Sequence, residues 1–213
     1  MLLFDLDGTL IDSNGVWVTV DECFLSRRGL RPTPEYCHTV GHSILPVAAQ
    51  FTRDYYGLTD TPEAIMAEWM EQARDAYAHH VPLKPGAGAF LRRCQEAGQT
   101  MVLVTACVPE LCEAVLRRHG LETVFSRRFF AQELGMEKRD PRYFQTVLSR
   151  LGVLPEQCVL FEDSPGACRT ARESGIRVVG VYDPFYETSQ AEIRACSHRY
   201  IRSFEELLNE PLL

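Results

Sequence analysis

Two carboxylates follow a short apolar segment at the beginning of the chain. The segment Leu2–Phe4 has the character of a buried strand, and Asp5 and Asp7 come directly after it, followed by Gly8-Thr9. Because burial of an unpaired charge is costly, the two acids should lie at the end of the strand, in a crevice or in solvent. Carboxylates this close repel each other unless a cation or a shared proton relieves them. The pair alone is compatible with a cation site and with an ordinary Asp-Gly turn.

Two further apolar segments also end in residues that can do chemistry. Met101–Val104 ends at Thr105, and Val159–Phe161 ends at Glu162 and Asp163. Parallel strands present their carboxyl ends along one edge of a sheet, which is where open α/β folds bind ligands. We therefore expect these groups to converge with the first pair of acids. Several carboxylates in one crevice require a hard cation, and an all-oxygen ligand set favours Mg²⁺ over zinc.

Lysine is scarce in this chain, which makes its positions informative. Only Lys84 and Lys138 occur, and every other formal side-chain cation is arginine. Lys138 precedes the helix-start signal Asp140-Pro141 and supplies a point charge suited to phosphate. A strand-end hydroxyl such as that of Thr105, beside a helix start, can bind an anion. A metal, a carboxylate nucleophile, a hydroxyl and a lysine together predict phosphoryl transfer.

The elements that must position these residues are inferred from hydrophobic periodicity. From residue 81 onward, helical and strand patterns alternate, which is typical of a parallel sheet with helices on both faces. Residues 13–80 show helical periodicity without a convincing strand. The sequence predicts an α/β protein with a Rossmann-like parallel sheet core, residues 1–12 and 81–213, and an inserted all-helical cap, residues 13–80. The expected strands lie at 2–4, 101–104, 129–130, 159–161 and 178–181.

Composition and charge argue against several classes of function. Of the 213 residues, 46% are hydrophobic, enough for a sizeable core, and the net charge of −7 disfavours a general nucleic-acid binder or a protein of anionic membranes. No apolar run approaches transmembrane length. The eight cysteines form no C-x-x-C pair, and the first strand begins at Leu2 without a signal peptide before it, so we expect reduced thiols in a cytoplasm. A monomer is the default expectation.

Four segments resemble, in order, the motifs of the haloacid dehalogenase superfamily in its phosphatase branch. Their spacing is typical of the β-phosphoglucomutase-like group, and the helical insertion resembles the cap domain of that group. The resemblance covers essentially the whole chain and implies a hydrolase of phosphoric monoesters. The matching segments are Asp5-Leu6-Asp7-Gly8-Thr9-Leu10 for the first motif, Thr105 for the second, Lys138 with Asp140-Pro141 for the third and Glu162-Asp163-Ser164 for the fourth.

The resemblance implies catalytic and metal-binding roles for the matched acids. Asp5 would attack phosphorus and form an aspartyl-phosphate. Asp7 would protonate the leaving oxygen and then activate water. Mg²⁺ would be held by Asp5, by the backbone carbonyl of Asp7 and by Asp163, with Glu162 in support.

The resemblance also implies the phosphate contacts and reveals departures from the family pattern. Thr105, the Ala106 amide and Lys138 would hold phosphate oxygens. The family often has Asn or Ser where Ala106 stands, so a side-chain contact is lost, and proline is common where this chain has Arg139. Gly166 comes one residue earlier than is usual in the fourth motif. None of these departures removes a catalytic group.

The choice of substrate is expected to depend on the cap. His42 lies where the related group places a substrate-facing loop, and it is both a candidate contact and an ordinary surface histidine. The expected function is that of a Mg²⁺-dependent phosphatase acting on a small phosphorylated metabolite.

Two alternatives to a phosphatase are considered. A sugar phosphomutase of the β-phosphoglucomutase type shares the chemistry but needs a cap cation for the sugar or a second phosphate. Residues 13–80 contain no lysine, so arginine would have to serve. A non-catalytic scaffold for protein binding belongs to another class, and the presence of Asp5, Asp7 and Asp163 argues against it. The identity of the substrate is left open.

Overall fold

A six-stranded parallel sheet forms the centre of the structure, a computed structural model that describes residues 1–41 and 43–211. The strand order is β3-β2-β1-β4-β5-β6, and every neighbouring pair is parallel. The strands are β1 (Leu2–Phe4), β2 (Met101–Thr105), β3 (Arg127–Phe130), β4 (Val159–Glu162), β5 (Arg177–Val181) and β6 (Arg199–Ile201). The first strand lies near the middle, with Leu2 opposite Met101 on one side and Val159 on the other. This arrangement confirms the predicted α/β class.

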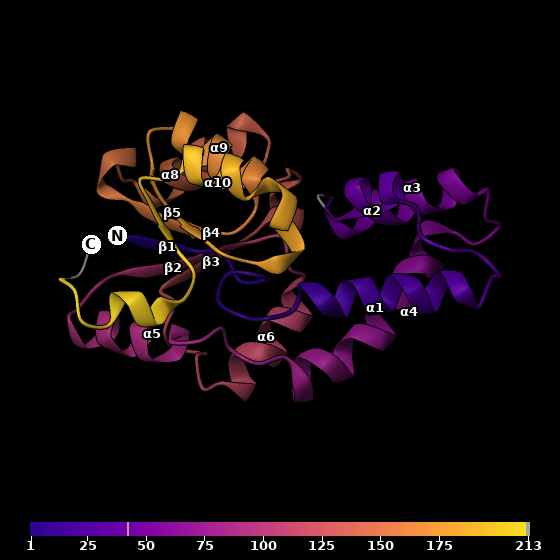
Figure 1. The fold of residues 1–213 in the computed structure, drawn as a ribbon, viewed down its shortest axis with the longest axis horizontal. Coiled ribbons are helices and arrows are strands. Elements are labelled where there is room, and N and C mark those ends of the chain that lie inside the picture. The colour runs from indigo at the N-terminus through magenta and orange to yellow at the C-terminus, as the bar shows by residue number, and fades with distance from the viewer. Residues whose placement is uncertain (42, 212–213) are drawn as a thin grey trace.

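Helices cover both faces of the sheet (Figure 1). They are α5 (Ala87–Glu96), α6 (Pro109–Arg118), α7 (Ala131–Leu134), α8 (Pro141–Leu151), α9 (Pro165–Glu173) and α10 (Gln190–Cys196), with the 3₁₀-helices η2 (Pro155–Gln157), η3 (Pro184–Ser189) and η4 (Phe204–Leu207). Because strand side chains alternate between faces, Leu3 joins an apolar cluster with Phe144 of α8, whereas Phe4 joins another with Phe90 of α5. The sheet and these helices are called the sheet lobe. Both faces of the sheet are buried, as parallel strands require.

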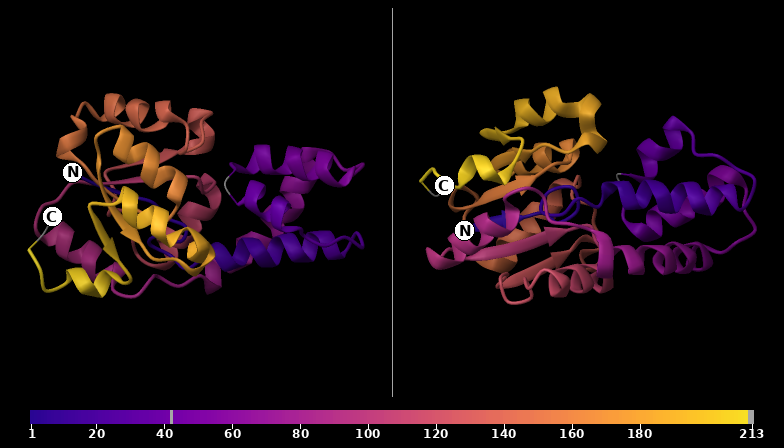
Figure 2. Two further views of the ribbon diagram at one scale, coloured as in Figure 1. Left: turned by 45° about the horizontal axis from the view of Figure 1, so that its top comes forward. Right: turned by 60° about the horizontal axis from the view of Figure 1, so that its bottom comes forward.

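The helical lobe, residues 14–80, lies beside the edge at which the central strands end (Figures 1 and 2). It contains α1 (Asn14–Ser26), α2 (Pro34–Val40), α3 (Leu45–Tyr56), α4 (Pro62–Asp75) and the π-helix η1 (Ala76–His80). The side chain of Thr61 caps α4 by accepting a hydrogen bond from the Ala64 N–H, with proline in the first turn. Within residues 1–41 and 43–211, no helix combines the length and the apolar character needed to cross a bilayer.

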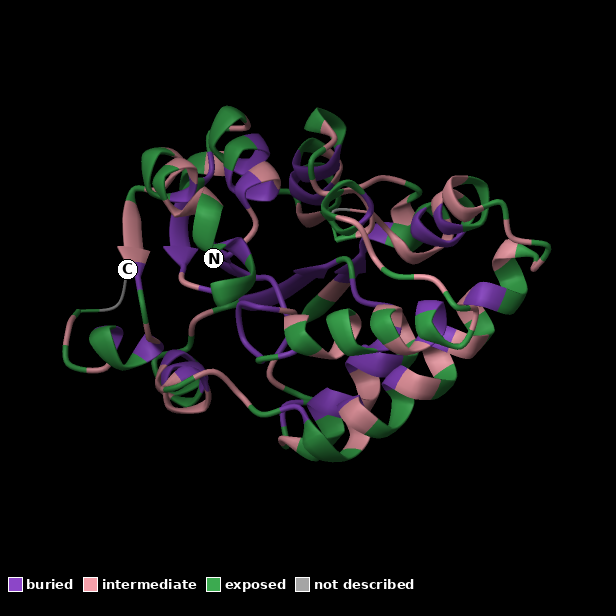
Figure 3. Ribbon diagram, turned by 45° about the vertical axis from the view of Figure 1, so that its right-hand side comes forward, coloured by how far each residue is buried: buried purple, intermediate pink, exposed green. Residues whose placement is uncertain are grey.

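Packing is continuous from the helical lobe into the sheet lobe. One apolar cluster includes Trp69 and Tyr77 of the helical lobe together with Phe4 of β1. The guanidinium of Arg74 on α4 pairs with Glu110 on α6, with Nε 2.7 Å from Oε1. Figure 3 shows buried residues on the inward sides of the helices in both lobes and exposed residues on their outer sides. The division into a core and a cap at residues 12/13 and 80/81 therefore stays a prediction.

Several short elements are absent from the prediction or differ from it in their bounds. Helix α2 begins at Pro34 behind the capping residue Thr33, a start signal of the same kind as that of α4. Strands β3 and β6 are the two edge strands, and their polar residues break the apolar pattern, so β3 begins at Arg127 rather than at residue 129. Near the end of the chain, η4 begins with a capping box between Ser203 and Glu206.

Candidate active site

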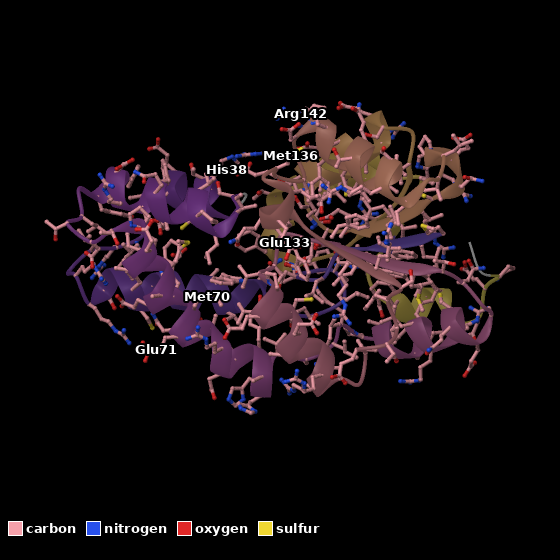
Figure 4. The ribbon with its side chains drawn as sticks, turned by 180° about the vertical axis from the view of Figure 1, so that it is seen from behind. His38, Met70, Glu71, Glu133, Met136 and Arg142 are labelled. Atoms are coloured by element: carbon pink, nitrogen blue, oxygen red, sulfur yellow. The ribbon has the colours of Figure 1, made fainter. Side chains whose placement is uncertain are left out.

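A cavity of about 260 Å³ is lined by residues from both lobes. The helical lobe contributes residues of α1, α2, α3 and α4, and the sheet lobe contributes the segments that follow β1, β2 and β4. Figure 4 shows side chains of both lobes along their junction, with His38 on the helical side and Met136 on the sheet side. The acids that the sequence predicts to converge all line this cavity: Asp5, Asp7, Glu162 and Asp163.

Strand register brings three of these acids together. Phe4 of β1 pairs with Phe161 of β4, so the residues that follow, Asp5 and Glu162, are neighbours at the same edge of the sheet. The Asp5 N–H donates to the Phe161 carbonyl at 3.0 Å, which continues the ladder by one residue. Carboxylate oxygens of Asp5, Glu162 and Asp163 lie within 4.8 Å of one another, and all three side chains are buried.

Lys138 reaches this group from the loop before α8. Its Nζ lies 2.6 Å from Oδ1 of Asp5 and 2.7 Å from Oε2 of Glu162. Burial on its own would lower the pKa of the Lys138 ammonium, but the charges of Asp5 and Glu162 outweigh burial and raise that pKa well above its ordinary value. Lys138 is therefore charged and bridges two neighbouring carboxylates.

One lysine does not balance three buried carboxylates. Burial, and after it the charge of Glu162, raises the pKa of Asp5 to about 8, because the effect of Lys138 is smaller. The same two causes raise the pKa of Asp163 well above its ordinary value. The group offers oxygen ligands and excess negative charge in a buried place, which is the environment that suits a hard divalent cation. The donor set therefore fits the predicted metal.

Asp163 is held by residues near the beginning of the chain. Thr9 Oγ1 donates to its Oδ1 at 2.6 Å, and Asn14 Nδ2 lies 3.4 Å from its Oδ2. Gly8, with φ of +78°, allows this approach, since a Cβ at that position would lie 2.3 Å from Oδ2 of Asp163. Gly8 of the first motif thus permits both the turn and the close approach of Asp163. Neither Thr9 nor Asn14 is among the site residues predicted from the sequence.

Asp7 points toward the two connections between the lobes. Its Oδ1 accepts a hydrogen bond from Ser13 Oγ at 2.6 Å and another from the hydroxyl of Tyr77 in η1. The Tyr77 hydroxyl in turn accepts from Trp17 Nε1 at 2.9 Å. Asp7 lines the cavity. Among the described residues, it does not belong to the group of Asp5, Glu162 and Asp163, whose carboxylate oxygens lie within 4.8 Å of one another. Its expected metal contact, through the backbone carbonyl, stays a prediction.

The two predicted phosphate contacts at the end of β2, Thr105 and Ala106, differ in their position relative to the cavity. Thr105 is fully buried, and its Oγ1 accepts a hydrogen bond from the Cys107 N–H at 3.0 Å, so the hydroxyl supports the turn after the strand. Ala106 is exposed and lines the cavity, whereas Thr105 is not among the described lining residues. Ala106 therefore lies at the cavity, whereas the phosphate contact expected of Thr105 stays a prediction.

A second buried ion pair, which is not among the predicted site residues, supports the site. Asp183 Oδ2 accepts from Lys84 Nζ at 2.5 Å, and its Oδ1 accepts from Asn14 Nδ2 at 3.1 Å. Asn14 thus connects Asp183 with Asp163. The signal was present, because Asp183 follows the apolar strand β5 as Asp163 follows β4, and Lys84 is one of the two lysines.

The candidate contact His42 lies outside the described residues. Its neighbours Gly41 and Ser43 line the cavity. The role of the histidine therefore stays a prediction.

Known proteins share the sequence pattern and the fold of this chain. The family model for haloacid dehalogenase-like hydrolases matches residues 2–181. The chain is 39% identical over 101 residues to a phosphoserine phosphatase of Thermus thermophilus, a match that covers 47% of this chain and 41% of that protein. It is 28% identical over 196 residues to validoxylamine A 7'-phosphate phosphatase of Streptomyces hygroscopicus subsp. limoneus, which covers 84% of each. The solved structure of CbbY from Rhodobacter sphaeroides in complex with phosphate has the same fold, with a TM-score of 0.82 and 21% identity over 97% of this chain and 95% of that one.

Proposed function

The chain belongs to the haloacid dehalogenase-like hydrolase family, and on that basis we propose that it is a Mg²⁺-dependent phosphatase that hydrolyses a small phosphorylated metabolite through an aspartyl-phosphate. The observation that carries the proposal is the group around Asp5. Its Oδ1 is 2.6 Å from Lys138 Nζ, and it lies in the buried acidic group that Asp163 completes. A nucleophile, a cation and further metal-binding carboxylates are thus together at one cavity.

The proposed reaction consists of two displacements at phosphorus. In the first, an oxygen of Asp5 forms a bond to phosphorus as the ester P–O bond breaks, and Asp7 gives its proton to the leaving oxygen. In the second, Asp7 takes a proton from water, the water oxygen attacks phosphorus, and the carboxylate of Asp5 leaves. Inorganic phosphate is released, and both aspartates return to their initial states. Lys138, which keeps its charge, offsets the negative charge of the phosphoryl group.

The residues proposed to hold Mg²⁺ include the nucleophile itself. Asp5, the carbonyl of Asp7 and Asp163 would bind the ion, with Glu162 in support. When bound, the ion supplies positive charge that offsets repulsion between the carboxylates and the phosphate oxygens. The further phosphate contacts that we propose are Thr105 and the Ala106 amide.

The helical side of the cavity favours a phosphatase over a phosphomutase. A mutase that binds a second phosphate needs a cation there. Among the described residues of the helical lobe that line the cavity, none is lysine or arginine. The relatives from Thermus thermophilus and Streptomyces hygroscopicus are both named as phosphatases, which supports the same choice.

Two finer parts of the proposal concern the setting of the enzyme. All eight cysteines are free, which supports a reducing compartment such as the cytoplasm. We propose a monomer, because one chain supplies the nucleophile, the acid/base and the metal ligands.

The test is phosphate release from a panel of small phosphorylated metabolites, with Mg²⁺ and with EDTA. Wild type should release phosphate only with the metal, and Asp5→Asn should release none, because the amide is a poor nucleophile. Asp12→Asn is the matched control, since Asp12 is exposed and does not line the cavity. Metal-independent release, or release by Asp5→Asn at the wild-type rate, would contradict the mechanism. Conversion of β-glucose 1-phosphate to the 6-phosphate without phosphate release would identify a mutase.

A further inference from the structure

The cavity carries far more negative than positive charge. Among the described lining residues the cations are Lys138 and Arg139, and both belong to the sheet lobe. Lys138 is paired with Asp5 and Glu162, and the Arg139 Nε lies 2.5 Å from Oε2 of Glu137. Even a bound divalent cation leaves this balance negative, and a phosphate ester adds further negative charge. The carboxylates that line the cavity are Asp5, Asp7, Asp21, Glu22, Glu137, Glu162 and Asp163.

Two of these carboxylates lie on the helical side without a cationic partner. Asp21 and Glu22 are neighbours on α1, and neither forms an ion pair with any residue in the described part of the chain. The hydroxyl of Tyr36 donates to Asp21 Oδ1 at 3.0 Å and fixes that side chain at the wall. Burial raises the pKa of Asp21 to about 6, so the group is ionised at neutral pH at a cost that a cation would offset.

The rest of the helical wall is apolar and includes one hydrogen-bond donor without a partner. Trp17, Val40 and Leu45 line this side and give it an apolar surface. Trp69 also lines it and is 2% exposed. Its indole Nε1 is the one buried side-chain donor for which the described residues supply no partner. Because this nitrogen has no exposed surface, the contacts that this part of the wall offers to a ligand are apolar.

We propose that the helical side of the cavity binds the alcohol part of the phosphate ester, and that this alcohol is a hydroxylated amine whose ammonium group pairs with Asp21 and Glu22. The carbon skeleton of the ligand packs on the apolar wall. Alcohols that carry a carboxylate or a second phosphate are disfavoured, because they add negative charge to a cavity that already has an excess of it. This inference rests on the proposed phosphatase function and names the substrate class of that site.

The test compares hexose-derived phosphate esters that differ in charge. Glucosamine 6-phosphate carries an ammonium group, glucose 6-phosphate carries a hydroxyl at the same position, and 6-phosphogluconate carries a carboxylate. We expect kcat/KM to fall in that order, with at least a tenfold preference for the amine over glucose 6-phosphate, which corresponds to about 1.4 kcal/mol. p-Nitrophenyl phosphate serves as a general phosphatase substrate.

Substitution of the acidic residues tests whether they cause the preference. Asp21→Asn should lower kcat/KM for glucosamine 6-phosphate about tenfold, mainly through KM, and change the value for glucose 6-phosphate less than twofold. Glu22→Gln should act in the same direction and keeps the test informative if Asp21→Asn folds poorly. Asp54→Asn is the control, because Asp54 is an exposed acid of α3 that does not line the cavity.

The outcomes separate this inference from the proposed function. No metal-dependent turnover of any substrate, p-nitrophenyl phosphate included, would overturn the phosphatase proposal itself. Turnover with equal kcat/KM for the three sugar phosphates, or an equal loss on all of them in Asp21→Asn, would overturn only the assignment of the amine site. A preference for the amine that disappears in Asp21→Asn and persists in Asp54→Asn would support it.

Discussion

Replacement of Asp163 by asparagine should stabilise the metal-free protein and reduce its stabilisation by Mg²⁺. In the protein without metal, the buried Asp163 carboxylate has oxygens within 4.8 Å of those of Asp5 and Glu162. At an effective dielectric constant of about 20, two unit charges at that separation repel by about 3.5 kcal/mol. Proton uptake limits this cost, since protonation of a carboxyl with an ordinary pKa requires only about 4 kcal/mol at pH 7. Removal of one charge therefore relieves about 3–4 kcal/mol.

The same substitution weakens one hydrogen bond. Thr9 Oγ1 donates to Asp163 Oδ1 at 2.6 Å, and a neutral amide in place of the carboxylate loses about 1–2 kcal/mol. Metal-free Asp163→Asn should therefore be more stable than wild type by about 1–3 kcal/mol, which raises Tm by about 2–12 °C for a chain of this length. Saturating Mg²⁺ should reverse the order, because the ion stabilises only the protein that binds it.

Thermal unfolding in EDTA and in Mg²⁺, followed by calorimetry, measures both effects. The pH dependence adds a sign test for wild type. The pKa of Asp5 is raised from about 4 in the unfolded chain to about 8 in the folded protein, so the native state binds more protons between these values. Stability of the metal-free protein should therefore fall as pH rises through this window, and Mg²⁺ should reduce the slope. A less stable Asp163→Asn in EDTA, with a wild-type shift on addition of Mg²⁺, would refute the reasoning.

Three further substitutions test the support of the site. Gly8→Ala places a Cβ 2.3 Å from Asp163 at φ of +78°, so Tm should fall by about 4–8 °C and the Mg²⁺-induced shift should shrink; an unchanged melting curve would contradict this. Tyr77→Phe removes a donor to Asp7 and should lower kcat about tenfold at nearly constant KM, measured by steady-state kinetics; a change in KM alone would argue against a positioning role. Lys84→Met leaves Asp183 buried without its cation and should lower the free energy of unfolding, measured in urea, by about 3–5 kcal/mol. A second substitution, Asp183→Asn, in the same chain should largely recover this loss. An equal loss in the single and the double variant would exclude the ion pair as the cause.

The sequence predicts the positions that depend on local pattern. Each apolar strand that ends in acids is recognisable within a few residues, and parallel pairing is enough to bring Asp5 near Glu162 and Asp163. The start of α4 is equally local, because Thr61 and proline act within one turn. These local patterns agree with the folded structure because tertiary packing favours the same elements.

The contacts that the sequence does not reveal are made over long separations. Tyr77 reaches Asp7 across 70 positions, and its place depends on how the π-helix η1 packs against α6. Asn14 joins Asp163 and Asp183, which belong to the ends of two different strands. A tyrosine or an asparagine in a helical pattern carries no local sign of such a partner. The contacts of these residues can be recognised only in the structure, where the two lobes pack against each other.

The central place of β1 has a consequence for the order in which the protein can be made. Leu2 pairs with Met101 and with Val159, so the strand that is synthesised first has neither partner until much of the chain exists. At a ribosomal rate of about 5–20 residues per second, β1 waits roughly 5–20 s for β2 and roughly 8–30 s for β4. The helices of residues 14–80 emerge in that interval and can collapse on local contacts alone. The nascent helical segment can therefore begin to fold before the sheet does, while an apolar, unpaired strand is attached to its N-terminal end.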